Sequence, residues 1–122
     1  MDKNFLVVDA AMNDLLRPSI YKAYHHIQPV DISNNEEFVA DIVGPVCESG
    51  DFLGKEREIK KCKSGDLIAV MSAGAYGIVM SSNYNARRRP TEILVDGDHY
   101  SIIRKRETYE QLMQNEDLIT NS

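Results

Sequence analysis

The chain has 122 residues, enough for one domain to bury its own hydrophobic core. Apolar residues make up 43% of the sequence and charged residues 27%, which argues against a disordered or fibrous protein. A net charge of -5 argues against a general surface for nucleic acid or an anionic membrane. We therefore expect a single globular domain over residues 1–122.

The two cysteines, Cys47 and Cys62, are too few for a disulfide framework and lack the spacing of a metal site. They favour free thiols in a reducing cytoplasm. No apolar run reaches the roughly 18 residues of a membrane helix, and the residues after Met1 do not form a secretory signal. The expected protein is cytoplasmic, with no metal site, no membrane segment and no nucleic-acid partner.

Strand signals dominate the first half of the chain. Residues 5–8 form an unbroken apolar run that predicts a buried strand, and residues 24–28 predict another strand. Between them, Pro18 interrupts a helix-friendly stretch and favours short helical turns over one long helix. After a polar loop, residues 38–43 alternate as a strand does when one of its faces is wet.

The second half contains the most apolar segment, Leu67 to Met71, which predicts a buried central strand. Asp96-Gly97-Asp98 separates two apolar runs, 91–95 and 99–103, as in a β-hairpin. Apolar side chains at helical spacing after Glu107 predict a terminal helix. Six or seven short strands, short helical turns and this helix indicate a mainly all-β fold, a sandwich or a Greek-key-like barrel.

The stretch Gly44 to Gly54 holds three glycines and a proline in eleven residues, so the backbone must bend tightly. We expect the bend to expose Cys47 and Glu48. A thiol donates a proton or acts as a nucleophile; the alternative is a small buried apolar side chain, which suits Cys62 better. Glu48 suits an ammonium group, against the alternative of a solvated loop charge. Asp51 is a weaker candidate, because Gly-Asp is ordinary turn chemistry.

Arg17 and Tyr21 are four residues apart, so a helical turn places a guanidinium beside a phenol. This pair suits a carboxylate, although helix capping and packing explain it equally well. The segment Gly74 to Gly77 lets the backbone approach a ligand closely. Within it Tyr76 offers a hydroxyl to a phosphate or a carboxylate, although the motif is weak.

Histidines and arginines elsewhere favour plainer roles. His25 and His26 are adjacent, so on a strand they point to opposite faces and do not share one metal ion. We interpret both as structural. The basic run Arg87 to Arg89 predicts a solvated face or an interface patch.

Three pieces of the sequence, in order, resemble one known family. They are Val8 to Tyr21, Gly44 to Gly54, and Gly74 to Gly77 followed by Ser82-Asn83-Tyr84-Asn85. Together they resemble the C-terminal domain of the diaminopimelate decarboxylases, in the alanine-racemase-like class of pyridoxal-phosphate enzymes. The resemblance covers almost the whole chain. It implies a β-sandwich or barrel domain that follows a (β/α)8 barrel carrying the cofactor on a lysine.

The resemblance implies a role for each candidate residue. Arg17 and Tyr21 resemble the pair that binds the distal carboxylate of the substrate. Glu48 resembles the carboxylate that holds the distal ammonium group. Cys47 resembles the cysteine that one subunit lends to its dimer partner, where it protonates Cα after carbon dioxide leaves. Tyr76 resembles the tyrosine that contacts the substrate and the cofactor phosphate.

The implied whole enzyme is a homodimer that converts meso-2,6-diaminopimelate to L-lysine and carbon dioxide in lysine biosynthesis. Residues 1–122 lack the barrel, which binds most of the pyridoxal 5'-phosphate, so the resemblance implies that they are inactive alone. One alternative is the same domain of a decarboxylase for arginine, ornithine or carboxynorspermidine. Arg17 and Tyr21 argue against it, because these substrates lack a distal carboxylate. The other alternative is a β module that only mediates association.

Overall fold

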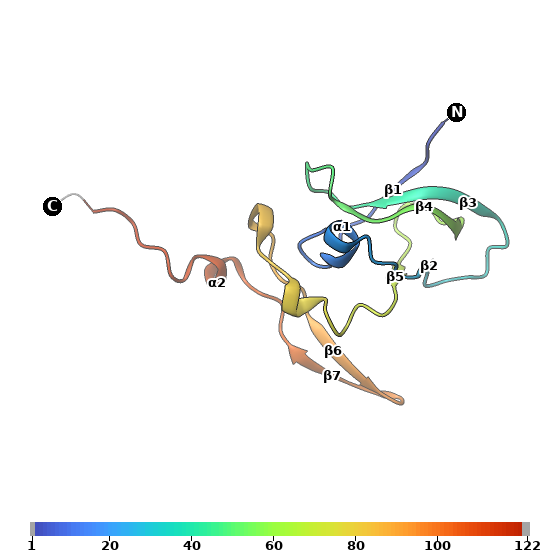
Figure 1. The fold of residues 1–122 in the computed structure, drawn as a ribbon. Coiled ribbons are helices and arrows are strands. Elements are labelled where there is room, and N and C mark those ends of the chain that lie inside the picture. The colour runs from blue at the N-terminus through green and yellow to red at the C-terminus, as the bar shows by residue number, and fades with distance from the viewer. Residues whose placement is uncertain (1, 121–122) are drawn as a thin grey trace. The chain divides into compact units, whose positions relative to one another are not determined.

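The computed structural model describes residues 2–120 and consists mainly of short strands, as the sequence predicts. The chain divides into two compact units, residues 1–81 and 82–122. The first unit contains β1 (Phe5–Val7), α1 (Arg17–Tyr21), β2 (Ile27–Pro29), β3 (Glu37–Val43), β4 (Phe52–Lys60), β5 (Ile68–Val70) and the 3-10 helix η1 (Ile78–Met80). The second contains the 3-10 helix η2 (Tyr84–Ala86), β6 (Glu92–Asp96), β7 (His99–Arg104) and α2 (Tyr109–Met113) (Figure 1). Among residues 2–120 we find no helix with the length and apolar character required to span a bilayer.

The first unit is built around a three-stranded sheet in the order β1, β3, β4. β1 runs parallel to β3, from the pair Phe5 and Asp41 to the pair Val7 and Val43. β3 and β4 are antiparallel neighbours, so residues 44–51 form the loop that reverses the chain between them. A second sheet pairs β2 with β5 in an antiparallel register.

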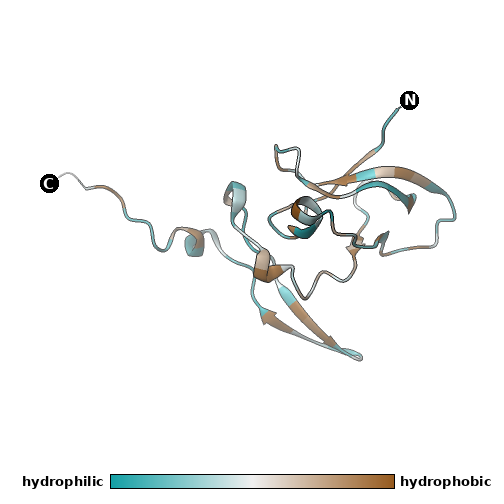
Figure 2. Ribbon diagram, viewed as in Figure 1, coloured by the Kyte–Doolittle hydropathy of each residue, from teal (hydrophilic) through white to brown (hydrophobic). Residues whose placement is uncertain are grey.

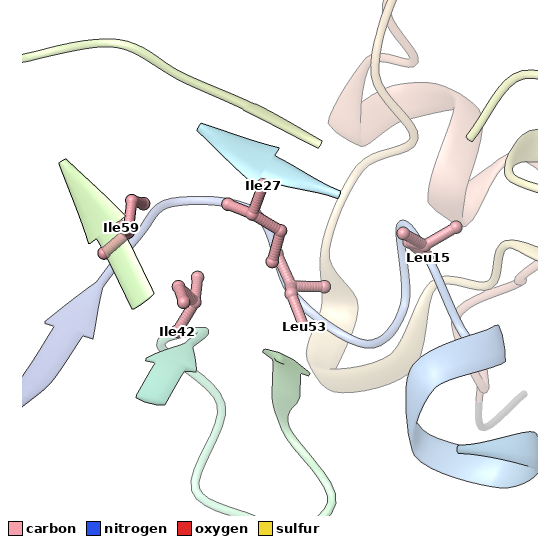
Figure 3. Close-up of a cluster of buried hydrophobic side chains, with 5 residues drawn as sticks. All are labelled: Leu15, Ile27, Ile42, Leu53 and Ile59. Atoms are coloured by element: carbon pink, nitrogen blue, oxygen red, sulfur yellow. The ribbon is translucent and has the colours of Figure 1, made fainter. Parts of the chain in front are cut away.

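The hydrophobic core of the first unit consists of five buried side chains from the segment before α1 and from β2, β3 and β4. They are Leu15, Ile27, Ile42, Leu53 and Ile59, which gather together in Figure 3. Ile42 and Leu53 are 0% and 1% exposed, so burial of each contributes on the order of 2 kcal/mol to folding. The core therefore anchors the two strands that flank the loop of residues 44–51.

The segment Leu67 to Met71 is not the buried central strand predicted from its apolar run. Only Ile68–Val70 form a strand, β5, and they are half-buried, while Leu67 is 71% exposed. Within the part of the chain that the structure describes, β5 pairs with β2 alone. A strand is buried on both faces only when other layers cover the sheet, and an apolar run does not provide those layers.

The strand predicted at residues 5–8 is present as β1, but the prediction that it is buried is wrong. Phe5 and Val7 are 59% and 68% exposed, whereas Leu6 and Val8 pack against the core. Side chains alternate along a strand, so only one face of β1 meets the core. An unbroken apolar run did not distinguish this half-buried strand from a fully buried one.

Most other elements agree with the sequence. β3 contains the predicted strand 38–43, β6 and β7 form the predicted hairpin, and α2 is the predicted terminal helix. The strand predicted at residues 24–28 lies slightly later in the chain, as β2. The sequence pattern did not reveal β4, because its charged residues obscure the inward-facing Leu53 and Ile59.

The second unit has no buried residue in its described part, residues 82–120. Figure 2 shows that β6 and β7 are apolar along much of their length, although their side chains are largely exposed. Gly97, with φ of 61°, forms the tight turn between the two strands. Outside the hairpin, Glu107 Oε1 accepts hydrogen bonds from Asn83 Nδ2 at 2.5 Å and from the Arg89 N–H at 3.1 Å.

The basic run Arg87 to Arg89 is half-buried, so it does not form a solvated face, and the alternative of an interface patch stays a prediction. Arg89 Nη1 donates a hydrogen bond to Asn83 Oδ1 at 2.9 Å. The guanidinium of Arg88 lies 4.5 Å from the centroid of the Tyr109 ring, within the range of a cation-π contact. These arginines therefore hold parts of the second unit together.

Candidate functional site

The loop of residues 44–51 carries two of the predicted site residues. Backbone hydrogen bonds shape it, from Glu48 N to Val46 O at 2.8 Å and from Asp51 N to Glu48 O at 3.1 Å. The side chain of Val46 is buried, whereas Cys47 and Glu48 are exposed. The prediction that this bend exposes the thiol and the neighbouring carboxylate is confirmed.

The carboxylate of Asp51 supports the loop from inside. Asp51 is 3% exposed; its Oδ1 accepts a hydrogen bond from Met12 N at 2.7 Å, and its Oδ2 accepts one from Val46 N at 2.6 Å. Gly44 packs against it so closely that a Cβ there would lie 2.5 Å from Oδ2. The sequence suggested only turn chemistry for Asp51. The supporting role was not visible because Met12 is 39 residues away.

Helix α1 positions the predicted carboxylate-binding pair. Pro18 stands in its first turn, where the fixed φ and the missing N–H of proline favour a helix start. The guanidinium carbon of Arg17 lies 5.7 Å from the ring centroid of Tyr21 and 5.1 Å from that of Tyr76. The predicted proximity of guanidinium and phenol is confirmed. None of the ion pairs found within residues 2–120 involves Arg17.

The loop meets α1 at Gly50. A Cβ on Gly50 would lie 2.9 Å from Ser19 Oγ and 3.6 Å from Glu48 Oε1, so these two polar groups flank the same small space. Ser19 belongs to α1, between Arg17 and Tyr21 in sequence. The structure therefore brings Glu48 to the helix that carries the pair. Sequence reasoning missed Ser19, because nothing local distinguishes it from an ordinary helix residue.

Cys47 is exposed on the loop next to Glu48. In the described part of the chain, no hydrogen bond or ring contact joins it to Arg17, Tyr21 or Tyr76. Tyr21 and Tyr76 are themselves 62% and 57% exposed. Within this chain the thiol and both phenol rings of the candidate site are therefore open to the surface.

Of the two adjacent histidines, His25 has the structural environment predicted for it, whereas the structural role of His26 stays a prediction. His25 is buried, and its Nδ1 lies 3.0 Å from Met71 O, so Nδ1 carries the proton and donates it to the carbonyl. His26 is exposed, with Nε2 3.0 Å from Gln28 Oε1. Among residues 2–120 no group of three or more His, Cys, Asp or Glu side chains is arranged to hold a metal ion.

Comparison with known proteins gives consistent matches. Residues 1–74 match a family model described as pyridoxal-dependent decarboxylase, C-terminal sheet domain. The chain is 61% identical over 115 residues to a diaminopimelate decarboxylase of Neisseria meningitidis serogroup A, covering 94% of this chain and 28% of that protein. It is 55% identical over 112 residues to the diaminopimelate decarboxylase of Aquifex aeolicus, covering 92% of this chain and 27% of that protein. The chain therefore spans little more than a quarter of the curated relatives that it matches.

A solved structure gives the same result for the fold. It is the diaminopimelate decarboxylase of M. jannaschii in complex with L-lysine, with a TM-score of 0.89 and 43% sequence identity. The match covers 94% of this chain and 26% of that one. The similarity thus extends over both compact units and leaves most of the larger protein unmatched.

Proposed function

Because the chain belongs to the family of C-terminal sheet domains of pyridoxal-dependent decarboxylases, we propose that it is the substrate-recognising domain of a diaminopimelate decarboxylase. The intact enzyme converts meso-2,6-diaminopimelate to L-lysine and carbon dioxide. The 61% identity to the Neisseria protein supports this assignment. Because the chain spans 28% of that protein, we assign the (β/α)8 barrel, with most of the cofactor site, to the remainder. Residues 1–122 then form the β domain that follows it.

The observation that carries the proposal is the position of Arg17 next to two tyrosine rings. Its guanidinium carbon lies 5.7 and 5.1 Å from the ring centroids of Tyr21 and Tyr76, and no carboxylate of residues 2–120 forms an ion pair with it. A guanidinium without an internal partner binds a carboxylate through two parallel hydrogen bonds, and a phenol hydroxyl adds another donor. Diaminopimelate has a distal carboxylate, which arginine, ornithine and carboxynorspermidine lack.

Glu48 and Cys47 supply the remaining groups of the proposed site. The carboxylate of Glu48, beside Ser19, accepts hydrogen bonds from the distal ammonium of the substrate. Cys47 is exposed on the same loop. In the proposed enzyme it reaches the active site of a second subunit. The proposal therefore includes a homodimer in which each loop completes the site of its partner.

The residues present fit only one part of pyridoxal phosphate, its phosphate group. Tyr76 is 57% exposed, so its phenol is accessible and can donate to the phosphate. The lysines of the described part are exposed, apart from the half-buried Lys60. None of them has the enclosed surroundings that covalent capture of the cofactor requires. The capturing lysine and the phosphate cradle are therefore assigned to the barrel.

Pyridoxal phosphate, when bound, would supply an acceptor for the electron pair that decarboxylation leaves on Cα. The residues of this chain supply orientation and a proton. Arg17, Tyr21 and Glu48 hold the far end of the substrate, which fixes the direction of the carboxylate that leaves. Cys47 holds a proton at Sγ and delivers it to one face of Cα. A substrate without a distal carboxylate leaves Arg17 unpaired in a closed site, so it reacts more slowly.

A chimeric enzyme tests the proposal. In it, this chain replaces the matching 115-residue segment of the Neisseria meningitidis diaminopimelate decarboxylase. We expect release of carbon dioxide from meso-diaminopimelate. Arg17→Ala removes a charged hydrogen-bond partner worth about 1.5–3 kcal/mol, so kcat/KM should fall about 10- to 150-fold. The exposed Arg106 provides the control, and Arg106→Ala should stay within about twofold.

Three outcomes contradict parts of the proposal. A change of less than about threefold in kcat/KM for Arg17→Ala removes this residue from the site. Faster turnover of ornithine or arginine than of diaminopimelate assigns the chain to another decarboxylase. A folded, cofactor-loaded chimera that turns over none of these substrates favours the association module.

A further inference from the structure

Asp51 joins two segments of the proposed site that are far apart in the sequence. Its Oδ1 accepts a hydrogen bond from Met12 N at 2.7 Å, and its Oδ2 accepts one from Val46 N at 2.6 Å. Its own backbone also closes the loop, because Gly44 N donates to Asp51 O at 3.1 Å. One buried residue thus holds the loop together and ties it to the segment around Met12.

The two donors adjoin the residues that bind and react. Val46 directly precedes Cys47, so the hydrogen bond of the Val46 N–H fixes the backbone next to the residue that carries the exposed thiol. Met12 lies in the turn where Asp14 N donates to Ala11 O at 2.9 Å, and this turn leads into α1. The Asp51 carboxylate therefore connects the loop of the proton donor to the helix of the carboxylate-binding pair.

We propose that Asp51 is a positioning residue, whose buried carboxylate holds Cys47 and Glu48 in a fixed register with α1. This inference rests on the proposed function, because it assigns Asp51 to the alignment of that same site. Asp51 acts through the backbone of Val46 and Met12. It touches neither the substrate nor the cofactor.

The geometry requires a carboxylate at this position. Each oxygen accepts from a different N–H, at distances typical of charge-assisted hydrogen bonds. An amide would offer one oxygen and turn its NH2 group toward the other N–H donor. Gly44 leaves no room for adjustment, since a Cβ there would lie 2.5 and 2.6 Å from the two oxygens. Asp51→Asn and Gly44→Ala therefore disturb the same pair of hydrogen bonds from opposite sides.

Amide hydrogen exchange in this 122-residue chain provides a test that does not depend on activity. The amides of Met12 and Val46 should exchange at least about tenfold more slowly than the amide of the exposed Ser49 in the same loop. Asp51→Asn should remove this protection while leaving that of the core residue Ile42. If the Met12 and Val46 amides of the unmodified chain exchange as fast as that of Ser49, the proposal is overturned.

Kinetics of the chimera separate positioning from mere structural support. Per folded, cofactor-loaded site, Asp51→Asn and Gly44→Ala should lower kcat and raise KM, reducing kcat/KM about 10- to 100-fold. Asp66→Asn is the matched control, because Asp66 Oδ2 accepts a hydrogen bond from Lys63 N at 2.8 Å in an exposed turn of the same unit. It should stay within about twofold. A purely structural role would reduce the folded fraction and leave kcat and KM per folded site unchanged.

The outcomes distinguish this inference from the function on which it rests. A folded Asp51→Asn chimera with kcat/KM within about threefold of the parent overturns the role of Asp51 alone. An unmodified chimera without turnover of diaminopimelate overturns the proposed function, and the exchange measurement still decides whether Asp51 holds the loop. If Asp51→Asn does not fold, Gly44→Ala and the exchange of the unmodified chain decide the question.

Discussion

Two antiparallel hairpins in residues 2–120 contain apolar strand residues, yet they differ in burial. In the first unit, the hairpin of β3 and β4 buries Ile42, Leu53 and Ile59, which are at most 3% exposed. In the second unit, the hairpin of β6 and β7 leaves Val95 and Tyr100 69% and 73% exposed. Apolar strands are therefore stabilised by burial only where other elements cover one of their faces.

Within residues 82–120 the second unit has no buried core, and polar contacts and a tight turn stabilise it instead. Arg104 Nε lies 2.5 Å from Glu92 Oε2, and Glu107 accepts hydrogen bonds from Asn83 and Arg89. An exposed ion pair contributes at most about 1 kcal/mol. We therefore expect residues 82–120 to open locally at a lower free energy than the core of the first unit.

The sharpest test of this contrast removes the same atoms from both hairpins. Ile42→Ala empties a site that is 0% exposed and should lower the free energy of unfolding by about 2–5 kcal/mol. Ile102, on β7, is 60% exposed, so Ile102→Ala should change it by no more than about 0.5 kcal/mol. Urea unfolding of both variants measures the difference. Equal losses would show that the second hairpin is stabilised by burial after all.

A smaller effect is expected from the polar cluster of the second unit. Glu107→Ala removes the hydrogen bonds that Glu107 Oε1 accepts from the Arg89 N–H and from Asn83 Nδ2, while Asn83 Nδ2 keeps its bond to Arg87 O, and this should cost about 1–2 kcal/mol. The loss should appear as faster amide exchange within residues 82–120 only. The exposed Glu110 of α2 serves as the control, through Glu110→Ala. Equally faster exchange at Ile42 would mean that the two units unfold as one.

Each unit also contains a carboxylate that responds to pH. Burial acts to raise the pKa of Asp41, but the N–H of Glu56 and the ammonium of Lys3 outweigh it and hold this pKa below the ordinary 3.8. The hydrogen bond from the Arg89 N–H is the main cause that holds the pKa of Glu107 below 4.5. Both groups are therefore more acidic in the folded chain than in the unfolded one.

Acid should therefore destabilise both units. We expect this effect to be smaller than those of Ile42→Ala and Glu107→Ala. Stability from a carboxylate with a lowered pKa is present above the unfolded pKa, about 4 here, and is lost as pH falls through the folded value. Unfolding free energies measured between about pH 6 and pH 3 should decrease. Asp41→Asn should flatten this dependence in the first unit and Glu107→Gln in the second. A gain in stability on acidification would contradict the assignment.

The parts of the fold that the sequence predicted correctly depend on local signals. The turn at Asp96-Gly97-Asp98 and the alternation of β3 act over a few residues, so both elements could be read directly. The predicted burial of Leu67 to Met71 was wrong because it depends on whether other layers cover both faces of β5, which an apolar run does not provide. β4 was missed because four charged residues, Lys55 to Glu58, separate the inward-facing Leu53 and Ile59, and register shifts against β3 further interrupt its alternation.

The same distinction applies to the candidate site. The proximity of Arg17 and Tyr21 follows from four-residue spacing on a helix, and the exposure of Cys47 follows from the glycines around it. The approach of Tyr76 to Arg17 joins residues far apart in the sequence, and only the family resemblance had linked them. The support from Asp51 could not be predicted because it needs a backbone N–H from another part of the unit.

The unequal surroundings of the two thiols make this chain selectively addressable by electrophilic reagents. Burial raises the pKa of Cys62, and the charge of Asp66 raises it further, so its reactive thiolate is scarce at neutral pH. Cys47 is exposed on a loop that a buried carboxylate and a chain of hydrogen bonds keep in place. A maleimide dye or a spin label added in limiting amount should therefore attach at Cys47 first. The label then becomes a spectroscopic reporter at the rim of the proposed site, in a chain whose native sequence is unchanged.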